Sequence, residues 1–306
     1  MSAIMPETLF RDLSGEEDVG FATIHSPTQH SPGGTPYLVK PGVVMLARPM
    51  VHPTGLQGFL AGFDESLHFS EYLDDPTPLP DGAQLCKIAG QLCYMSFGRG
   101  RTFNVNAERY FNNLKSSGHG SVFEHANYSL LLYGISRSVT HELVRHRAGL
   151  GYSQLSQRYV SGRMLRFVER REYQEDEELH AQFLERIERA AGEYAALTNR
   201  LLEMQQAGTK ILSAEARTDL RKKVQQTARS VLPNETEAPI VVTGNARAWR
   251  HIIEMRANAH AETEIRELAV RVFLCLYLAD PVLFGDYTLE ENLDGTYIVK
   301  TEYEKV

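Results

Sequence analysis

The densest concentration of charged and titratable side chains is a basic segment that reads Arg-His-Arg at 145–147 and, after eight residues, Ser-Gln-Arg-Tyr at 156–159. A guanidinium group donates to two phosphate oxygens at once, and a hydroxyl or amide completes the contacts around an anion. Gly149 and Gly151 allow the connecting loop unusual backbone angles. We therefore expect a site for an anionic ligand. A solvated face of surface ion pairs is the alternative, because arginine outnumbers lysine throughout the chain.

A second basic segment, residues 245–256, begins Asn-Ala-Arg and has the apolar spacing of a helix. Trp249, Ile252 and Ile253 lie on one stripe of this helix, and Arg256 follows on the same face. An inward guanidinium needs a partner, which is either a buried carboxylate or the ring of Trp249. In a functional site the same cation would stabilise negative charge that develops on a substrate.

Two histidine-containing segments do not fit a metal site. His119 and His125 lie six residues apart in GHGSVFEH (118–125), and no further ligand set of standard spacing is evident. In HELVRH (141–146) the second histidine stands at i+5, which is about 140° around a helix from the first, so the zinc-protease motif HExxH is not met. We expect no metal, and the glycine-rich and serine nucleophile motifs of nucleotide-binding and hydrolase folds are also absent from the sequence.

The three cysteines, Cys86, Cys93 and Cys275, match neither a zinc motif nor a redox pair. Cys86 and Cys93 stand seven residues apart, on one apolar face of an expected helix, and Cys275 lies in the apolar run VFLCLYL. We expect three buried thiols and no activated thiolate nucleophile.

Hydrophobic periodicity predicts an α+β fold, with a mixed or antiparallel sheet flanked by long helices. Residues 1–40 are rich in Pro, Gly, Ser, Thr and His and are expected to be a loosely ordered extension of a single catalytic domain, 41–306. The expected strands are 41–51, 126–135 and 238–244. The expected helices are 83–95, 106–118, 136–146, 175–206, 214–229, 245–255 and 260–280.

Composition restricts the function. The 306 residues are 42% hydrophobic and carry a formal net charge of −7, which disfavours a protein that coats nucleic acid. No run of about 18 apolar residues and no signal peptide is found, so we expect a cytoplasmic protein without a membrane partner.

The order of several motifs resembles the flavin-dependent thymidylate synthases. The signature of that family is Arg-His-Arg, seven or eight residues, and then Ser, usually continuing to Arg-Tyr. Here RHRAGLGYSQLSQRYV is the eight-residue form. The other matching segments are CYMSF at 93–97, GHGSVFEH at 118–125, TARSVLP at 227–233 and TGNARAWRHIIEMRANAHAETEIRE at 243–267. The resemblance covers roughly residues 95–280, and Arg-His-Arg alone would be a weak signal.

The resemblance implies a homotetramer with shared active sites. Each site would hold FAD beside dUMP and make dTMP, with methylenetetrahydrofolate as carbon donor and NADPH as reductant. The implied flavin contacts are Ser96, Ser121, Arg145, His146, Arg147, Gln154, Asn245, Arg247 and His251. The implied nucleotide contacts are Glu142, Arg145, Gln154, Ser156, Gln157, Arg158, Arg229 and Arg256. Arg256 is the implied catalytic residue, beside the uracil ring, where it favours the form ionised at N3.

Two positions depart from the family pattern. Glu142 stands where Gln is common, and a carboxylate there would repel a phosphate unless Arg229 or Arg158 neutralises it. His251 replaces an Asn found in some members.

Several alternatives remain open at this point. Ser156 is preferred as a substrate-binding hydroxyl over a nucleophile. The substrate could be UMP or another uridylate in place of dUMP. The chain could also be a non-catalytic nucleic-acid-binding module or an inactive structural tetramer.

Overall fold

The computed structural model describes residues 4–15, 21–159, 162–207 and 217–306. Its centre is a five-stranded antiparallel sheet in the order β1-β4-β5-β8-β6. The strands are β1 (Thr23–Ile24), β4 (Gly42–Ala47), β5 (Asn127–Tyr133), β8 (Ile240–Asn245) and β6 (Leu150–Gln154). Side chains alternate along β5, where Tyr128, Leu130 and Leu132 are buried and the residues between them are partly exposed. This alternation is typical of a sheet whose one face packs on a core.

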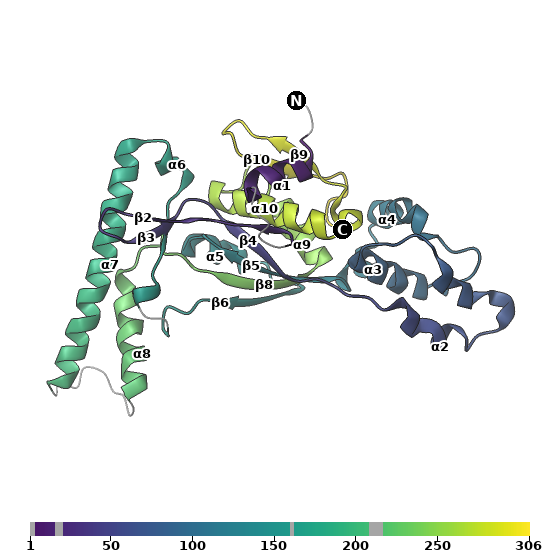
Figure 1. Ribbon diagram of the computed structural model, residues 1–306, viewed down its shortest axis with the longest axis horizontal. Coiled ribbons are helices and arrows are strands. Elements are labelled where there is room, and N and C mark those ends of the chain that lie inside the picture. The colour runs from purple at the N-terminus through teal and green to yellow at the C-terminus, as the bar shows by residue number, and fades with distance from the viewer. Residues whose placement is uncertain (1–3, 16–20, 160–161, 208–216) are drawn as a thin grey trace.

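Helices cover that buried face (Figure 1). They are α1 (Pro6–Ser14), α9 (Ala246–Arg256) and α10 (Thr263–Ala279). Ile252 and Ile253 of α9 are buried in the main core, and the indole Nε1 of Trp249 donates to the Tyr128 carbonyl at 3.3 Å. Apolar residues occur on all sides of α10, and 13 of its 17 residues are buried, which is the pattern of a central helix.

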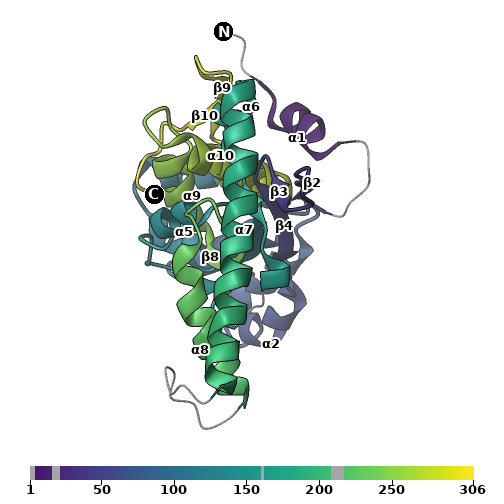
Figure 2. The ribbon, with the colours of Figure 1, turned by 90° about the vertical axis from the view of Figure 1, so that its left-hand side faces the viewer.

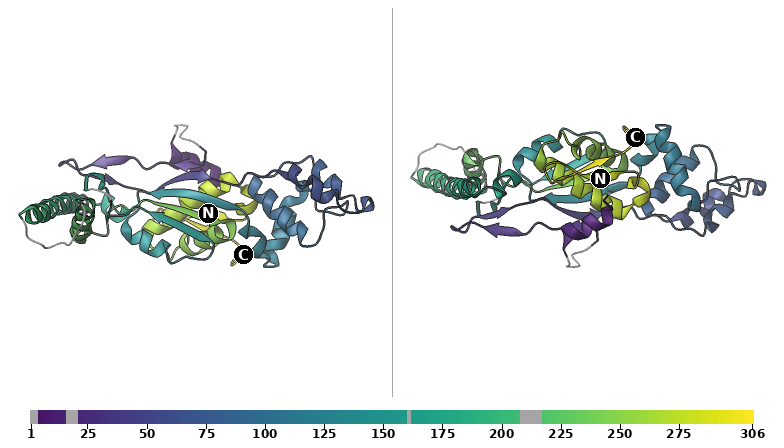
Figure 3. Two further views of the ribbon diagram at one scale, coloured as in Figure 1. Left: turned by 90° about the horizontal axis from the view of Figure 1, so that it is seen from below. Right: turned by 90° about the horizontal axis from the view of Figure 1, so that it is seen from above.

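Two helical groups lie at opposite ends of the sheet (Figures 1 and 3). At one end α6 (Arg171–Gln174) leads into the long helix α7 (Glu177–Gln206), and α8 (Arg217–Ala228) packs against α7 (Figure 2). At the other end are α2 (Gln57–Leu60), α3 (Asp81–Leu92) and α4 (Ala107–Ser116).

Shorter elements complete the described fold. β2 (Thr28–His30) and β3 (Pro36–Leu38) pair antiparallel, and β7 (Phe167–Val168) pairs parallel to β3. After α11 (Pro281–Phe284), β9 (Thr288–Glu291) and β10 (Tyr297–Lys300) form a hairpin. The 3-10 helices are Pro53–Leu56, Glu65–Leu67, Phe69–Asp74, Asn104–Asn106, Gly120–Glu124, Gly162–Met164 and Arg229–Val231.

The α+β class is confirmed, but the expectation of a loosely ordered extension at residues 1–40 does not match residues 4–15 and 21–40. These contain α1 and strands β1 to β3. Leu9 and Ile24 are buried in the main core, and β1 pairs with β4. Edge pairing and a few apolar anchors order this segment despite its polar composition, which periodicity alone does not reveal. Residues 1–3 and 16–20 lie outside the described part.

The prediction of three buried thiols is wrong for Cys93, which is exposed because α3 ends at Leu92. Burial raises the pKa of the Cys86 thiol to about 12 and also raises the pKa of Cys275. Within the described ranges, no helix is long and apolar enough to cross a membrane.

Candidate functional site

The Arg-His-Arg segment lies in a tight turn between α5 (Arg137–Leu143) and β6. The Ser136 side chain caps the start of α5 by accepting from the Val139 backbone N–H. At the other end, the Tyr152 hydroxyl lies 3.1 Å from the Leu143 carbonyl and 2.7 Å from the His146 carbonyl. The Tyr152 hydroxyl thereby ties the last residue of α5 to the turn and helps to position the His146 backbone.

Arg256 of α9 reaches this turn from 110 residues away in the sequence. Its Nε donates to His146 Nε2 at 3.0 Å, and its Nη1 donates to Glu142 Oε2 at 2.9 Å. The His251 ring stands edge-on to the His146 ring with centroids 5.4 Å apart. We call these four side chains, Glu142, His146, His251 and Arg256, the Arg256 cluster.

The Arg256 cluster fixes the protonation state of His146. Burial, the nearby Arg256 charge and His251 together lower the pKa of His146 to about 4. The imidazole is therefore neutral at physiological pH. Because Nε2 accepts from Arg256, the single ring proton belongs on Nδ1.

Glu142 finds a different neutralising partner from the two arginines considered from the sequence. The cation paired with it is Arg256, and neither Arg229 nor Arg158 forms an ion pair with it in the described structure. The side chains of Arg256 and Glu142 are 23% and 37% exposed, so the pair borders solvent and remains reachable by a ligand.

A cavity of about 440 Å³ lies beside the cluster, at the start of α9. Its lining is Glu124, Ala148, Gly149, Asn245, Arg247, Ala248, His251, Lys305 and Val306. Asn245 caps α9 by accepting from the Ala248 N–H at 2.8 Å. Gly149 has φ of 70°, and a Cβ there would lie 2.6 Å from Asn245 Nδ2, so only glycine fits this contact.

Arg247 points to the same cavity and is held by Glu124, whose Oε1 lies 2.6 Å from its Nη1. Glu124 belongs to the segment GHGSVFEH (118–125), and the sequence alone assigns it no role. Among the residues that can be described, no group of three or more His, Cys, Asp or Glu is placed to hold a metal.

The other site residues expected from the sequence lie around this centre without joining it. Arg145, Arg147, Gln154 and Arg158 are exposed. The Gln154 amide donates to Thr140 Oγ1 at 3.2 Å.

Gln157 is buried and lines a small cavity with Tyr194 of α7, and its Oε1 accepts from Arg137 at 3.4 Å. Ser156 and Arg229 are partly buried, and the Ser156 hydroxyl accepts from the Arg158 N–H.

Ser121 is exposed in the 3-10 helix Gly120–Glu124, which packs on α9. Ser96 follows α3, and its hydroxyl donates to the Gln91 carbonyl. No described contact joins Ser96 to the Arg256 cluster.

Sequence reasoning missed Tyr152, Lys305 and Val306. The tyrosine lies within the Arg-His-Arg motif and was visible but unassigned, whereas nothing in the local sequence of Lys305 and Val306 indicates a site. Only the fold brings the last two residues to α9.

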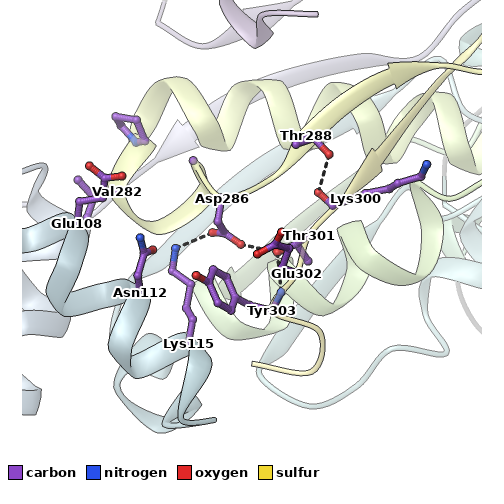
Figure 4. Close-up of a pocket in the computed structure, with 12 residues that line it drawn as sticks. Glu108, Asn112, Lys115, Val282, Asp286, Thr288, Lys300, Thr301, Glu302 and Tyr303 are labelled. Atoms are coloured by element: carbon purple, nitrogen blue, oxygen red, sulfur yellow. Dashed lines mark hydrogen bonds and ion pairs between the residues drawn. The ribbon is translucent and has the colours of Figure 1, made fainter. Parts of the chain in front are cut away.

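A larger cavity, about 660 Å³, lies between α4 and the segment after β10 (Figure 4). Its lining includes Lys115, Asp286 and Tyr303 and none of the site residues expected from the sequence. Size therefore does not identify the candidate site. The smaller cavity is lined by Arg247 and His251 and lies at the start of α9, a combination that suits an anionic ligand.

Comparison with known proteins identifies the family of this chain. The family described as "Thymidylate synthase complementing protein" matches residues 75–282. A flavin-dependent thymidylate synthase of Mycolicibacterium gilvum is 41% identical over 223 residues, which cover 72% of this chain and 86% of the relative.

Similar relatives with the same name occur in other bacteria. One from Mycobacterium sp. (strain KMS) is 42% identical over 74% of this chain and 87% of the relative. One from Corynebacterium glutamicum is 40% identical over 73% of this chain and 87% of the relative. The chain therefore belongs to the thymidylate synthase complementing protein family and is an enzyme of the flavin-dependent thymidylate synthase type.

Proposed function

We propose that this protein makes dTMP by transferring a one-carbon unit to C5 of dUMP, with FAD as cofactor, methylenetetrahydrofolate as carbon donor and NADPH as reductant. The observation that carries the proposal is the convergence of Arg256 on His146 and Glu142, from segments 110 and 114 residues apart, beside a cavity at the start of α9. The family membership and the names of the relatives support it.

The residues of the cavity fit a dinucleotide cofactor. FAD contains a diphosphate, and the cavity offers Arg247, the His251 ring and the positive end of the 11-residue helix α9. Its volume of about 440 Å³ lies in the range of small-molecule sites, roughly 300–1,000 Å³. When bound, the flavin would supply the redox chemistry of the reaction. Arg145, His146, Arg147, Asn245, Arg247 and His251 would hold it, with Ser96, Ser121 and Gln154 as further proposed contacts.

Arg256 has donor capacity left for the uracil ring. Nε and one proton of Nη1 are committed to His146 and Glu142, whereas Nη2 has no partner among the described residues. A guanidinium directed at N3 and the adjacent carbonyl favours the ionised ring and raises electron density at C5. The neutral His146 orients the guanidinium without adding a competing positive charge.

Binding of the nucleotide phosphate is assigned to exposed arginines. Arg145 and Arg158 have no ion-pair partner within the described ranges, and both side chains reach solvent. Gln154, Ser156, Gln157 and Arg229 are the further proposed nucleotide contacts. Cations exposed in a single chain suit a site completed by a neighbouring subunit, so we propose a homotetramer with shared active sites.

The purified protein tests the proposal directly. Flavin absorbance in the visible spectrum, and dTMP formation that requires NADPH and methylenetetrahydrofolate, are expected. A colourless protein that neither binds added FAD nor forms dTMP contradicts the proposal. Parallel assays with dUMP and UMP decide which uridylate is used, since discrimination depends on contacts to one 2′-hydroxyl.

A further inference from the structure

The segment 301–306 runs from the larger cavity to the candidate cofactor cavity along α9. It begins at a buried charge network in which Asp286 accepts from Lys115 Nζ at 2.7 Å and from Thr301 Oγ1 at 2.6 Å (Figure 4). Asp286 also receives two bonds, at 2.7 and 2.9 Å, from Arg250 of α9. The Tyr303 N–H donates to Thr301 Oγ1. The start of the segment is therefore tied to the same helix that carries Arg247 and His251.

The end of the segment is held in a specific backbone conformation. Lys305 has φ of 64°, a left-handed value that costs energy for a residue with a side chain. Its N–H donates to the Glu254 carboxylate, with oxygens at 2.9 and 3.3 Å, and Glu254 belongs to α9. This contact compensates for the strain and directs the last residues toward the cavity.

Val306 completes the segment as a buried residue, only 6% exposed. A Cβ added at Gly120 would lie 2.8 Å from Arg247 Nε and 3.0 Å from the main-chain carbon C of Val306. The Arg247 side chain and the Val306 main chain therefore both approach Gly120, and Arg247 and Val306 both line the cavity. Lys305 lines the same cavity, and its side chain has no described partner.

We propose that Lys305 is a cofactor-site residue: its contact with Glu254 and the burial of Val306 in the core hold its backbone at the cavity, and its ammonium group binds the diphosphate of the flavin dinucleotide. This inference rests on the proposed function. Lys305 lies outside residues 75–282, which the family model matches. Charge supports the inference, because Glu124 already neutralises Arg247 and Lys305 adds a cation to the wall of the same cavity.

The test is FAD affinity, measured by quenching of flavin fluorescence when the flavin-depleted full-length protein is titrated. Val306→Asp puts a carboxylate where the Val306 side chain packs in the core, so it is expected to release the end of the segment and to weaken FAD binding about threefold or more. Lys305→Gln is expected to weaken it about threefold to fivefold and to reduce its dependence on salt. A purely structural role of Lys305 would leave the salt dependence unchanged.

Two matched controls make the same chemical changes away from the cavity. Leu293→Asp changes a residue that is 98% exposed in the β9–β10 turn, and Lys300→Gln changes a lysine paired with Glu290. Both are expected to bind FAD within twofold of the wild type. Thermal unfolding of each variant shows whether it is folded, and if Val306→Asp is not, Lys305→Gln with its salt dependence decides the question.

The outcomes separate this inference from the proposed function. If Arg247→Ala weakens FAD binding while Lys305→Gln and a folded Val306→Asp stay within twofold of the wild type, the inference is overturned and the proposed function stands. If the wild-type protein binds no FAD, both are overturned.

Discussion

The neutral state of His146 has a measurable consequence for the pH dependence of stability. Its pKa in the folded protein is about 4, below the ordinary value of 6.5, because burial and then Arg256 and His251 oppose a positive charge. Between these values the unfolded chain binds the proton that the folded chain does not. The stabilisation that the folded protein gains from a neutral His146 is therefore fully present above pH 6.5 and is lost as the pH falls toward 4.

The magnitude follows from the shift. Between pH 7.5 and pH 5 a single group shifted this far contributes about 2 kcal/mol to the free energy of unfolding, at about 1.36 kcal/mol per pKa unit. His146 is only partly buried, so solvent screening reduces this to about 1 kcal/mol.

The perturbation is His146→Gln. Its amide oxygen can still accept from Arg256 Nε, but it does not titrate. Urea unfolding at pH 7.5 and pH 5 should show that the loss of stability on acidification is about 1 kcal/mol smaller in the variant than in the wild type. His260→Gln, which changes an exposed histidine after α9, is the control. Equal losses in the wild type and His146→Gln would refute the assignment of a neutral, desolvated imidazole.

Three further outcomes are expected. Arg256→Ala should lower kcat, whereas Arg158→Ala should mainly weaken dUMP binding, by about 2 kcal/mol in binding free energy. Steady-state kinetics measure the first effect and equilibrium binding of dUMP measures the second. If both substitutions changed only flavin retention, the assigned roles would be contradicted. Asp286→Ala leaves the buried Lys115 ammonium without its counter-charge. Urea unfolding should therefore show that the free energy of unfolding falls by about 3–5 kcal/mol. A decrease of less than about 1 kcal/mol would argue against a coupled network. Gly149→Ala would place a side chain at a left-handed φ and a Cβ 2.6 Å from Asn245 Nδ2. The substitution should therefore lower the free energy of unfolding by about 1–3 kcal/mol and weaken FAD binding. An unchanged melting temperature would count against this strain.

The charge of Asp286 explains why its loss should be so costly. Burial alone would raise the pKa of this carboxyl, but the hydrogen bonds and charge of Arg250, together with Lys115, hold it well below its usual range. The carboxylate is therefore ionised in the folded protein and compensates two buried cations.

Local sequence patterns predict the long elements and the chemical nature of the candidate site. The apolar spacing of residues 175–206 and 245–255 predicts α7 and α9, and the segments 126–135 and 238–244 predict the central pair β5 and β8. These predictions succeed because helix and strand periods depend on the local distribution of apolar residues. The basic motifs likewise indicate an anion site from residue types alone, since guanidinium chemistry does not depend on the fold.

The identity of the side chains that contact one another depends on the packing of the whole fold. Glu142 pairs with Arg256, Lys305 and Val306 line the same cavity as Arg247, and β3 pairs with β7. All of these contacts join segments that are distant in sequence. No local pattern encodes them, because such contacts depend on how the sheet and its helices pack as a whole. The same holds for the pKa of His146, which burial and two neighbours from α9 together lower.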